Sequence, residues 1–117
     1  IVFCYNRLAM NFVDFFSLML HRAVAEKMCV DEAKVLQMAR NNLVRWLKSE
    51  SFAGSERFAL LEWQEILEKS TPEEIRKIIT QDTDEGQRLR SSSPFVGVLS
   101  EAEREKIWSE CAEIRPV

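Results

Sequence analysis

We predict an all-α fold, a single compact bundle of five to six helices, from three features of the sequence. Apolar residues recur at helical spacing in successive segments, and no segment shows the alternating pattern of a strand. The 117 residues include only 3 Gly and 3 Pro, with 46% hydrophobic and 30% charged residues, which is typical of helix-rich globular domains. The stretches TPEE at 71–74 and SEAE at 100–103 are signatures of helix starts.

The chain begins with Ile1, and Met10 directly precedes the first clear helical pattern. We therefore expect one helical domain over residues 10–117 and interpret residues 1–9 as an upstream-translated or non-native extension. A genuine extension that packs on the domain is the competing interpretation. The apolar opening is interrupted by charged residues and shows neither a secretion signal nor a membrane span, so we expect no contact with a membrane.

The three cysteines Cys4, Cys29 and Cys111 are far apart and lack the spacing of a zinc site. Free thiols suit a reducing compartment, so we predict a cytoplasmic protein with no metal and no cofactor. The stretch DTDEG at 82–86 resembles the start of a calcium loop, but the required Gly and Glu positions hold Gln87 and Ser93.

The formal net charge is −3. Residues 1–50 carry seven Lys and Arg against five Asp and Glu, a net +2, whereas residues 51–117 carry nine against fourteen, a net −5. Proteins that bind duplex DNA usually show a clearly basic face. Nucleic acid is therefore an unlikely partner, and a DNA-binding regulator is the weakest of our functional hypotheses.

The first predicted helix covers residues 12–28, and its apolar positions spread over about 180° of arc. That is wider than one neighbouring helix requires. Either this helix is central in the fold, or part of it contacts a partner protein or a second copy of the chain. The partner surface would then comprise Phe12, Phe15, Leu18 and Arg22. The single histidine, His21, falls opposite the apolar arc and is expected to be exposed.

The other helices follow from caps and periodicity. Asp31 is a suitable N-cap for a second helix over 32–49, and Ser55 for a third over 56–69. Thr71, Asp82 and Ser100 introduce three shorter helices, which end near residues 80, 90 and 114.

Two arginines fall within the apolar faces of their helices: Arg40 in the second and Arg104 in the last. An unpaired buried guanidinium is costly. We therefore expect Arg40 and Arg104 to be buried polar anchors, paired with a carboxylate, carbonyls or a bound anion.

The stretch RLRSSSPFVGVLS at 88–100 allows two interpretations. In the one we favour, its apolar residues form an irregular loop that plugs the core, and its polar side chains satisfy the loop backbone. In the alternative, Arg88, Arg90, Ser93 and Arg104 bind a small ligand or a phosphate-like anion. No catalytic motif is present, so an enzyme is not predicted, and nothing in the spacing pairs His21 with a nucleophile.

The stretches ARNNLVRWL, EWQEIL and RLRSSSPFVGVLSEAER resemble a family of small helical bacterial proteins of the toxin–antitoxin-associated type, over about residues 18–110. The matching positions are Arg40, Asn42, Arg45, Trp46, Trp63, Leu89, Arg90, Ser93, Pro94, Phe95, Gly97, Leu99, Glu103 and Arg104. The resemblance implies an antitoxin-like interaction or regulatory protein that binds a partner protein, and the family offers no activity to carry over to this chain. This is our first functional hypothesis.

Overall fold

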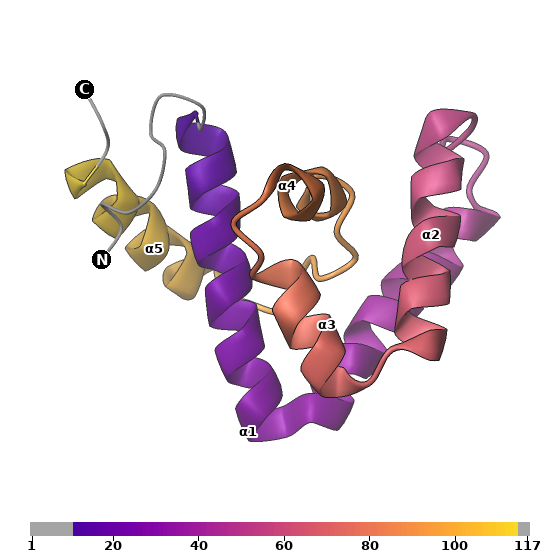
Figure 1. Cartoon of the computed structure of the whole chain (residues 1–117), viewed down its shortest axis with the longest axis horizontal. Helices are drawn as coiled ribbons and strands as arrows, with labels where there is room; N and C mark the ends of the chain where they lie inside the picture. Colours follow the sequence, from indigo (N-terminus) through magenta and orange to yellow (C-terminus); the bar gives the residue numbers. More distant parts are fainter. Residues whose placement is uncertain (1–10, 115–117) are drawn as a thin grey trace.

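The computed structural model of the chain describes residues 11–114, which form five helices (Figure 1). These are α1 (Phe12–Lys48), α2 (Ser55–Lys69), α3 (Pro72–Ile79), α4 (Asp84–Arg90) and α5 (Glu101–Glu113). No strand occurs between residues 11 and 114, so the all-α prediction is confirmed. The predicted extension, residues 1–9, lies outside the described residues, as does Cys4.

Helix α1 is one bent helix where the sequence predicted two. Asp31 interrupts it with non-helical backbone angles, φ −145° and ψ 73°. The Asp31 carboxylate accepts a hydrogen bond from the Lys34 N–H at 3.3 Å, as an N-cap does. Asp31 therefore starts the second half of α1, and the helix changes direction at this position (Figure 1).

Helix α1 is the central element of the bundle. It packs against each of the other four helices. Figure 1 shows α5 beside its first half and α2 beside its second half, with α3 and α4 between them. The central position explains the wide apolar arc of residues 12–28, because several neighbours each cover part of it.

The helix starts largely follow the predicted caps. Thr71 and Ser100 both form capping boxes, in which the hydroxyl accepts from the backbone N–H three residues on and the Glu at that position accepts from the cap N–H. Two positions differ. The cap of α4 is Thr83 rather than Asp82, and α2 has Gly54 as its N-cap, with Ser55 as its first residue.

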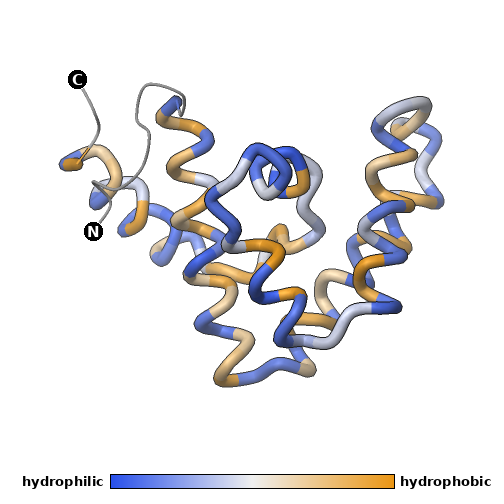
Figure 2. The backbone as a smooth tube through the Cα atoms, viewed as in Figure 1, coloured by the Kyte–Doolittle hydropathy of each residue, from blue (hydrophilic) through white to orange (hydrophobic). Residues whose placement is uncertain are grey.

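The core lies between both halves of α1 and the other elements, including the irregular segment 91–99. Apolar (orange) and hydrophilic (blue) residues alternate along the helices in Figure 2. Phe95, Val98 and Leu99 belong to the same cluster of buried side chains as Trp63 and the apolar residues of α1 and α3. Phe95 is 5% exposed, whereas its neighbour Val96 is 60% exposed.

The four residues predicted to form a partner surface are mostly covered by the chain itself, so this prediction is wrong. Phe15 and Leu18 are 3% and 0% exposed, so a partner could reach them only if the chain opened. Phe12 is half-buried, and its ring meets Trp108 of α5 edge-on, with 4.7 Å between the centroids. Arg22 alone of the four is exposed. These positions face the chain's own helices because α1 is central.

The prediction that Arg40 and Arg104 are buried is also wrong, because both residues are exposed. In the second half of α1 the buried side contains Asn42, while the apolar Val44 points to solvent. The buried side of this half is therefore rotated away from Arg40 relative to the face that its apolar residues predict. Arg104 lies on the same side of α5 as the buried Cys111, but near the start of the helix, where this side borders a pocket.

None of the helices between residues 11 and 114 combines the length and the apolar character that crossing a bilayer requires.

Gly86 in α4 provides a test of this packing. An added Cβ would lie 2.3 Å from the Gln81 carbonyl oxygen, so Gly86→Ala should lower the free energy of unfolding by about 1–3 kcal/mol through overpacking. Helix propensity alone predicts the opposite sign, a gain of about 1 kcal/mol. Denaturant unfolding decides between them. The control Asp84→Ala, an exposed position of α4, should change stability by less than about 0.5 kcal/mol, and a stabilised Gly86→Ala would contradict the packing around α4.

Candidate functional site

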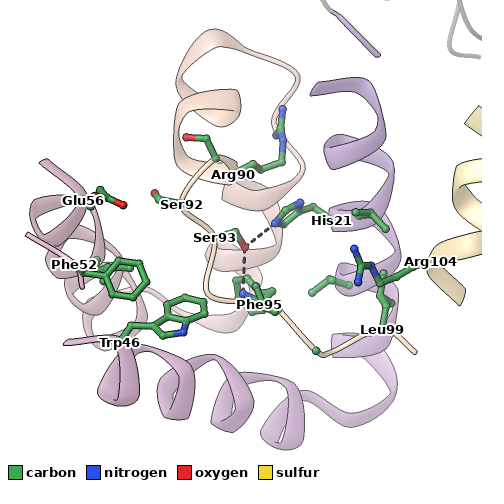
Figure 3. A pocket seen from close by; sticks show the side chains of 16 residues that line it. His21, Trp46, Phe52, Glu56, Arg90, Ser92, Ser93, Phe95, Leu99 and Arg104 are labelled. Carbon is green, nitrogen blue, oxygen red and sulfur yellow. Dashed lines mark hydrogen bonds between the residues drawn. The ribbon is translucent and has the colours of Figure 1, made fainter. Parts of the chain in front are cut away.

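A pocket of about 460 Å³ opens between both halves of α1, the loop before α2, the start of α2 and the segment 91–99. Its walls are mainly apolar and aromatic, formed by Leu20, Val24, Trp46, Phe52, Leu60, Phe95, Val96 and Leu99. Figure 3 shows Trp46, Phe52 and Glu56 on one side of this pocket and Arg104 beside Leu99 on the other, with His21 and Ser93 between them. Pockets that bind small molecules are usually of this size and mostly apolar, with a few polar groups.

His21 and Ser93 form the best-defined polar contact in the pocket wall. His21 Nε2 and Ser93 Oγ are 2.7 Å apart, and His21 Nδ1 is 2.7 Å from the Ser17 carbonyl oxygen. Because a carbonyl can only accept, Nδ1 carries the proton and Nε2 of the neutral ring is the acceptor. The Ser93 hydroxyl therefore donates to His21, while its oxygen accepts from the Phe95 N–H at 3.2 Å.

His21 is 7% exposed, so the prediction of an exposed histidine is wrong. Burial lowers the pKa of His21 from 6.5 to about 4; the hydrogen bond to the Ser17 carbonyl opposes this shift, and the positive charge of Arg90 adds to it. His21 is consequently neutral at pH 7, with its Nε2 lone pair directed at Ser93.

Asn42 fixes the other side of the segment 91–99. Its Nδ2 donates to the carbonyl oxygens of Pro94 and Val96, at 2.8 Å each. Its Oδ1 accepts from an Nη of Arg45 at 2.6 Å. Asn42 is buried, and both carbonyls lie in irregular backbone that no helix or sheet ladder satisfies. The side chain thus replaces the missing backbone partners of the loop.

Arg90 is the buried arginine of the fold, at 4% exposed. Its Nη1 donates to the carbonyl oxygens of Ile79 and Gln81, at 3.4 and 2.5 Å. Its Nε and Nη2 have no hydrogen-bond partner among the described residues. Burial lowers the pKa of this guanidinium, and the nearby carboxylates of Asp82 and Asp14 partly oppose the shift. Arg90 fills the anchor role that the sequence assigned to Arg40 and Arg104.

The structure brings together three of the four predicted anion-binding residues. Arg90, Ser93 and Arg104 all line the pocket. Arg88 does not; it is exposed and donates to the carboxylates of Glu62 and Glu85 at 2.7 to 2.9 Å. These two partners hold the pKa of Arg88 above its usual range. Arg88 therefore ties α4 to α2 rather than facing a ligand.

Sequence reasoning missed His21 and Asn42 as site residues. The sequence signal for His21 was its spacing. It stands three residues from Leu18 and from Val24, in a series of buried positions that starts at Phe15. For Asn42 the signal was its place between Ala39 and Leu43 on the buried side of α1. Between residues 11 and 114, no three His, Cys, Asp or Glu side chains gather closely enough to hold a metal ion.

Comparison of the chain with protein-family models, curated proteins and solved structures finds no match. The resemblance to toxin–antitoxin-associated bacterial proteins stays a hypothesis, and function is argued from the site itself.

Asn42→Ala should lower the free energy of unfolding by about 2 kcal/mol, because it leaves the buried Pro94 carbonyl and the partly buried Val96 carbonyl without their donor. The matched control is Asn41→Ala, one residue away. Asn41 is exposed and only accepts from Gln37, so that change should stay within about 0.5 kcal/mol. Urea unfolding followed by tryptophan fluorescence measures both. Equal effects of the two substitutions would show that Asn42 does not hold the loop.

His21 should make the protein sensitive to mild acid. Between pH 6.5 and about 4 the unfolded chain binds a proton at His21 and the folded chain does not, so the free energy of unfolding falls as the pH falls through this window. The loss attributable to His21 is about 3 kcal/mol, and above pH 6.5 there is none. In His21→Gln this component of the pH dependence should disappear. Denaturant unfolding of both proteins at several pH values measures the difference, and parallel curves would contradict a buried neutral His21.

Proposed function

We propose that the protein binds a small amphipathic anion in the pocket between α1, α2 and the segment 91–99. The observation that carries this proposal is the pocket itself: apolar and aromatic walls combined with the Arg104 guanidinium and the Ser93 hydroxyl. An apolar ligand body would replace water along Leu20, Val24 and Leu60. Its anionic group would lie near Arg104, where the guanidinium can form paired hydrogen bonds with a carboxylate or sulfonate.

The polarity of the pocket supports this orientation. Glu56 lies on the side of Trp46 and Phe52, and Arg104 lies across the pocket from them (Figure 3). An anion at the Glu56 side would meet a like charge, whereas at the Arg104 side it meets a cation. The exposure of Arg104 leaves its guanidinium accessible to a ligand that enters from solvent.

We further propose that the segment 91–99 is an apolar plug, which closes the core with Phe95 and forms one wall of the pocket. The Phe95 ring meets Trp63 edge-on, with 5.9 Å between the centroids. Two polar contacts from α1, at Asn42 and His21, hold the segment in place. In this arrangement the loop that completes the fold also shapes the ligand site.

Partner binding through α2 is a second candidate function. Phe58 and Leu61 are 71% and 44% exposed, and residues three apart lie on the same helix face. Neighbouring exposed apolar side chains on one helix face mark a surface that a protein partner can cover. Co-purification with the product of a neighbouring gene tests it: Phe58→Glu should abolish the complex, and an unchanged complex would remove α2 as the interface.

The anion-binding proposal is tested with 8-anilinonaphthalene-1-sulfonate, a fluorescent aromatic sulfonate. Saturable binding to the folded protein at a stoichiometry of one is expected. Arg104→Glu should weaken binding about tenfold or more, the equivalent of about 1.4 kcal/mol, because it replaces the cation with an anion. The control Lys106→Glu makes the same charge change at an exposed residue of α5 that does not line the pocket, and it should bind normally. Equal weakening by both substitutions, or no saturable binding, would contradict the proposal.

The plug is tested by a pair of neighbouring substitutions. Phe95→Ala should lower the free energy of unfolding by about 3–5 kcal/mol, because it leaves a cavity in the core. Val96→Ala, at an exposed position of the same loop, should stay within about 0.5 kcal/mol. Thermal or denaturant unfolding measures both. A loss below about 1 kcal/mol at Phe95 would show that the loop does not close the core.

A further inference from the structure

We propose that Ser93 is a nucleophile with His21 as its general base, and that the pocket hydrolyses esters of apolar carboxylic acids. This inference rests on the proposed ligand pocket and names its chemistry, because the product of such a reaction is a small amphipathic carboxylate. The residues that carry it are the two polar groups in the middle of the pocket wall (Figure 3).

The geometry is that of an activated hydroxyl. The Ser93 Oγ lies 2.7 Å from His21 Nε2, which is hydrogen-bond distance for proton transfer. The Ser17 carbonyl, 2.7 Å from Nδ1, fixes the tautomer that leaves Nε2 free to accept a proton. A nucleophile, a base and a group that orients the base are the three parts that nucleophilic catalysis by serine requires.

The surroundings of His21 keep the ring neutral, as a base must be. Burial is the cause, and the adjacent Arg90 adds to it. The same burial makes His21 a weak base, so a slow reaction is expected. Rotation of His21 away from Ser93 is hindered, because the ring is also tied to Ser17 and lies edge-on to Phe95, with 6.5 Å between the ring centroids.

One backbone group beside Ser93 can donate to the oxyanion that forms on the ester carbonyl. The Phe95 N–H already donates to Ser93 Oγ at 3.2 Å, so it lies next to the reacting oxygen. The Arg104 guanidinium also lines the pocket, so the pocket wall includes a cation that favours developing negative charge. Donors placed where negative charge develops lower the barrier of acyl transfer.

The reaction balances with water as the only co-reactant. The Ser93 hydroxyl proton passes to His21 Nε2 as Oγ bonds to the ester carbon. The bond from that carbon to the alkoxy oxygen then breaks, and the leaving alcohol takes the proton from His21. Water attacks the acyl-serine and passes its proton to His21; the acyl bond to Oγ breaks, and Ser93 regains the proton. The carboxylic acid is released and ionises.

The experiment uses an alkyl fluorophosphonate, which bonds covalently to activated serines with loss of fluoride. Each protein molecule needs to react with the fluorophosphonate only once to be detected, so a serine that reacts slowly is still labelled. Intact-mass measurement of the folded wild-type protein should show one added group, and peptide mapping should place it on Ser93. Because this peptide mapping uses the wild-type protein, its result does not depend on whether any substituted protein folds.

Variants then assign the roles. Ser93→Ala should lose the label, whereas Ser92→Ala, a matched change at the next residue, should keep it. His21→Gln should slow labelling about 100-fold or more, the smaller end of what a general base contributes. Hydrolysis of p-nitrophenyl butyrate should follow the same order, with circular dichroism confirming that each variant is folded.

The outcomes separate this inference from the ligand pocket. No label on the wild type, or a label on Ser91 or Ser92 in place of Ser93, would overturn it. If binding of anilinonaphthalene sulfonate persists in that case, the pocket proposal stands and only the nucleophile is refuted. If neither labelling nor binding is found, both are refuted.

Discussion

The hydrogen bonds between α1 and the irregular segment 91–99 are the constraint on which the rest of the structure depends. A non-helical segment that packs on a helical core needs side-chain partners for the backbone carbonyls that water does not reach, because an unpaired buried carbonyl is unfavourable. Asn42 donates to two of these carbonyls, and His21 adds a side-chain contact to the segment by accepting from the Ser93 hydroxyl. With these contacts made, Phe95 can be buried against Trp63 at little polar cost.

The same constraint explains why a pocket exists at this place. The side-chain hydrogen bonds to the segment 91–99 come from α1, whereas α2 contributes the edge-on ring contact of Trp63 with Phe95 and leaves a space beside its first turns. Apolar side chains from α1, the loop before α2, α2 itself and the segment 91–99 face that space. The polar groups that stabilise the loop, above all Ser93 and His21, therefore also become the polar groups of the pocket. Structural support and candidate chemistry arise from the same pair of residues.

Much of the fold could be predicted from the sequence, and much of the site could not. Local signals were sufficient for the helices: the capping boxes at Thr71 and Ser100 and the cap at Asp31 depend only on residues within four positions. The buried side of each helix was harder to predict, because it depends on which other elements pack against that helix. Val44 is apolar yet exposed, and His21 is polar yet buried. Pairing over a separation of 72 residues, as between His21 and Ser93, has no local signature at all.

The most direct test of this account is nuclear magnetic resonance of the imidazole of His21. It is the single histidine of the chain, so its ring signals can be assigned without ambiguity. The contact with Ser93 predicts a neutral ring protonated at Nδ1 throughout pH 5–8, with a titration midpoint near pH 4. A midpoint near pH 6.5, or a ring protonated at Nε2, would mean that His21 is not buried against Ser93, and the anchoring of the segment 91–99 would have to be abandoned.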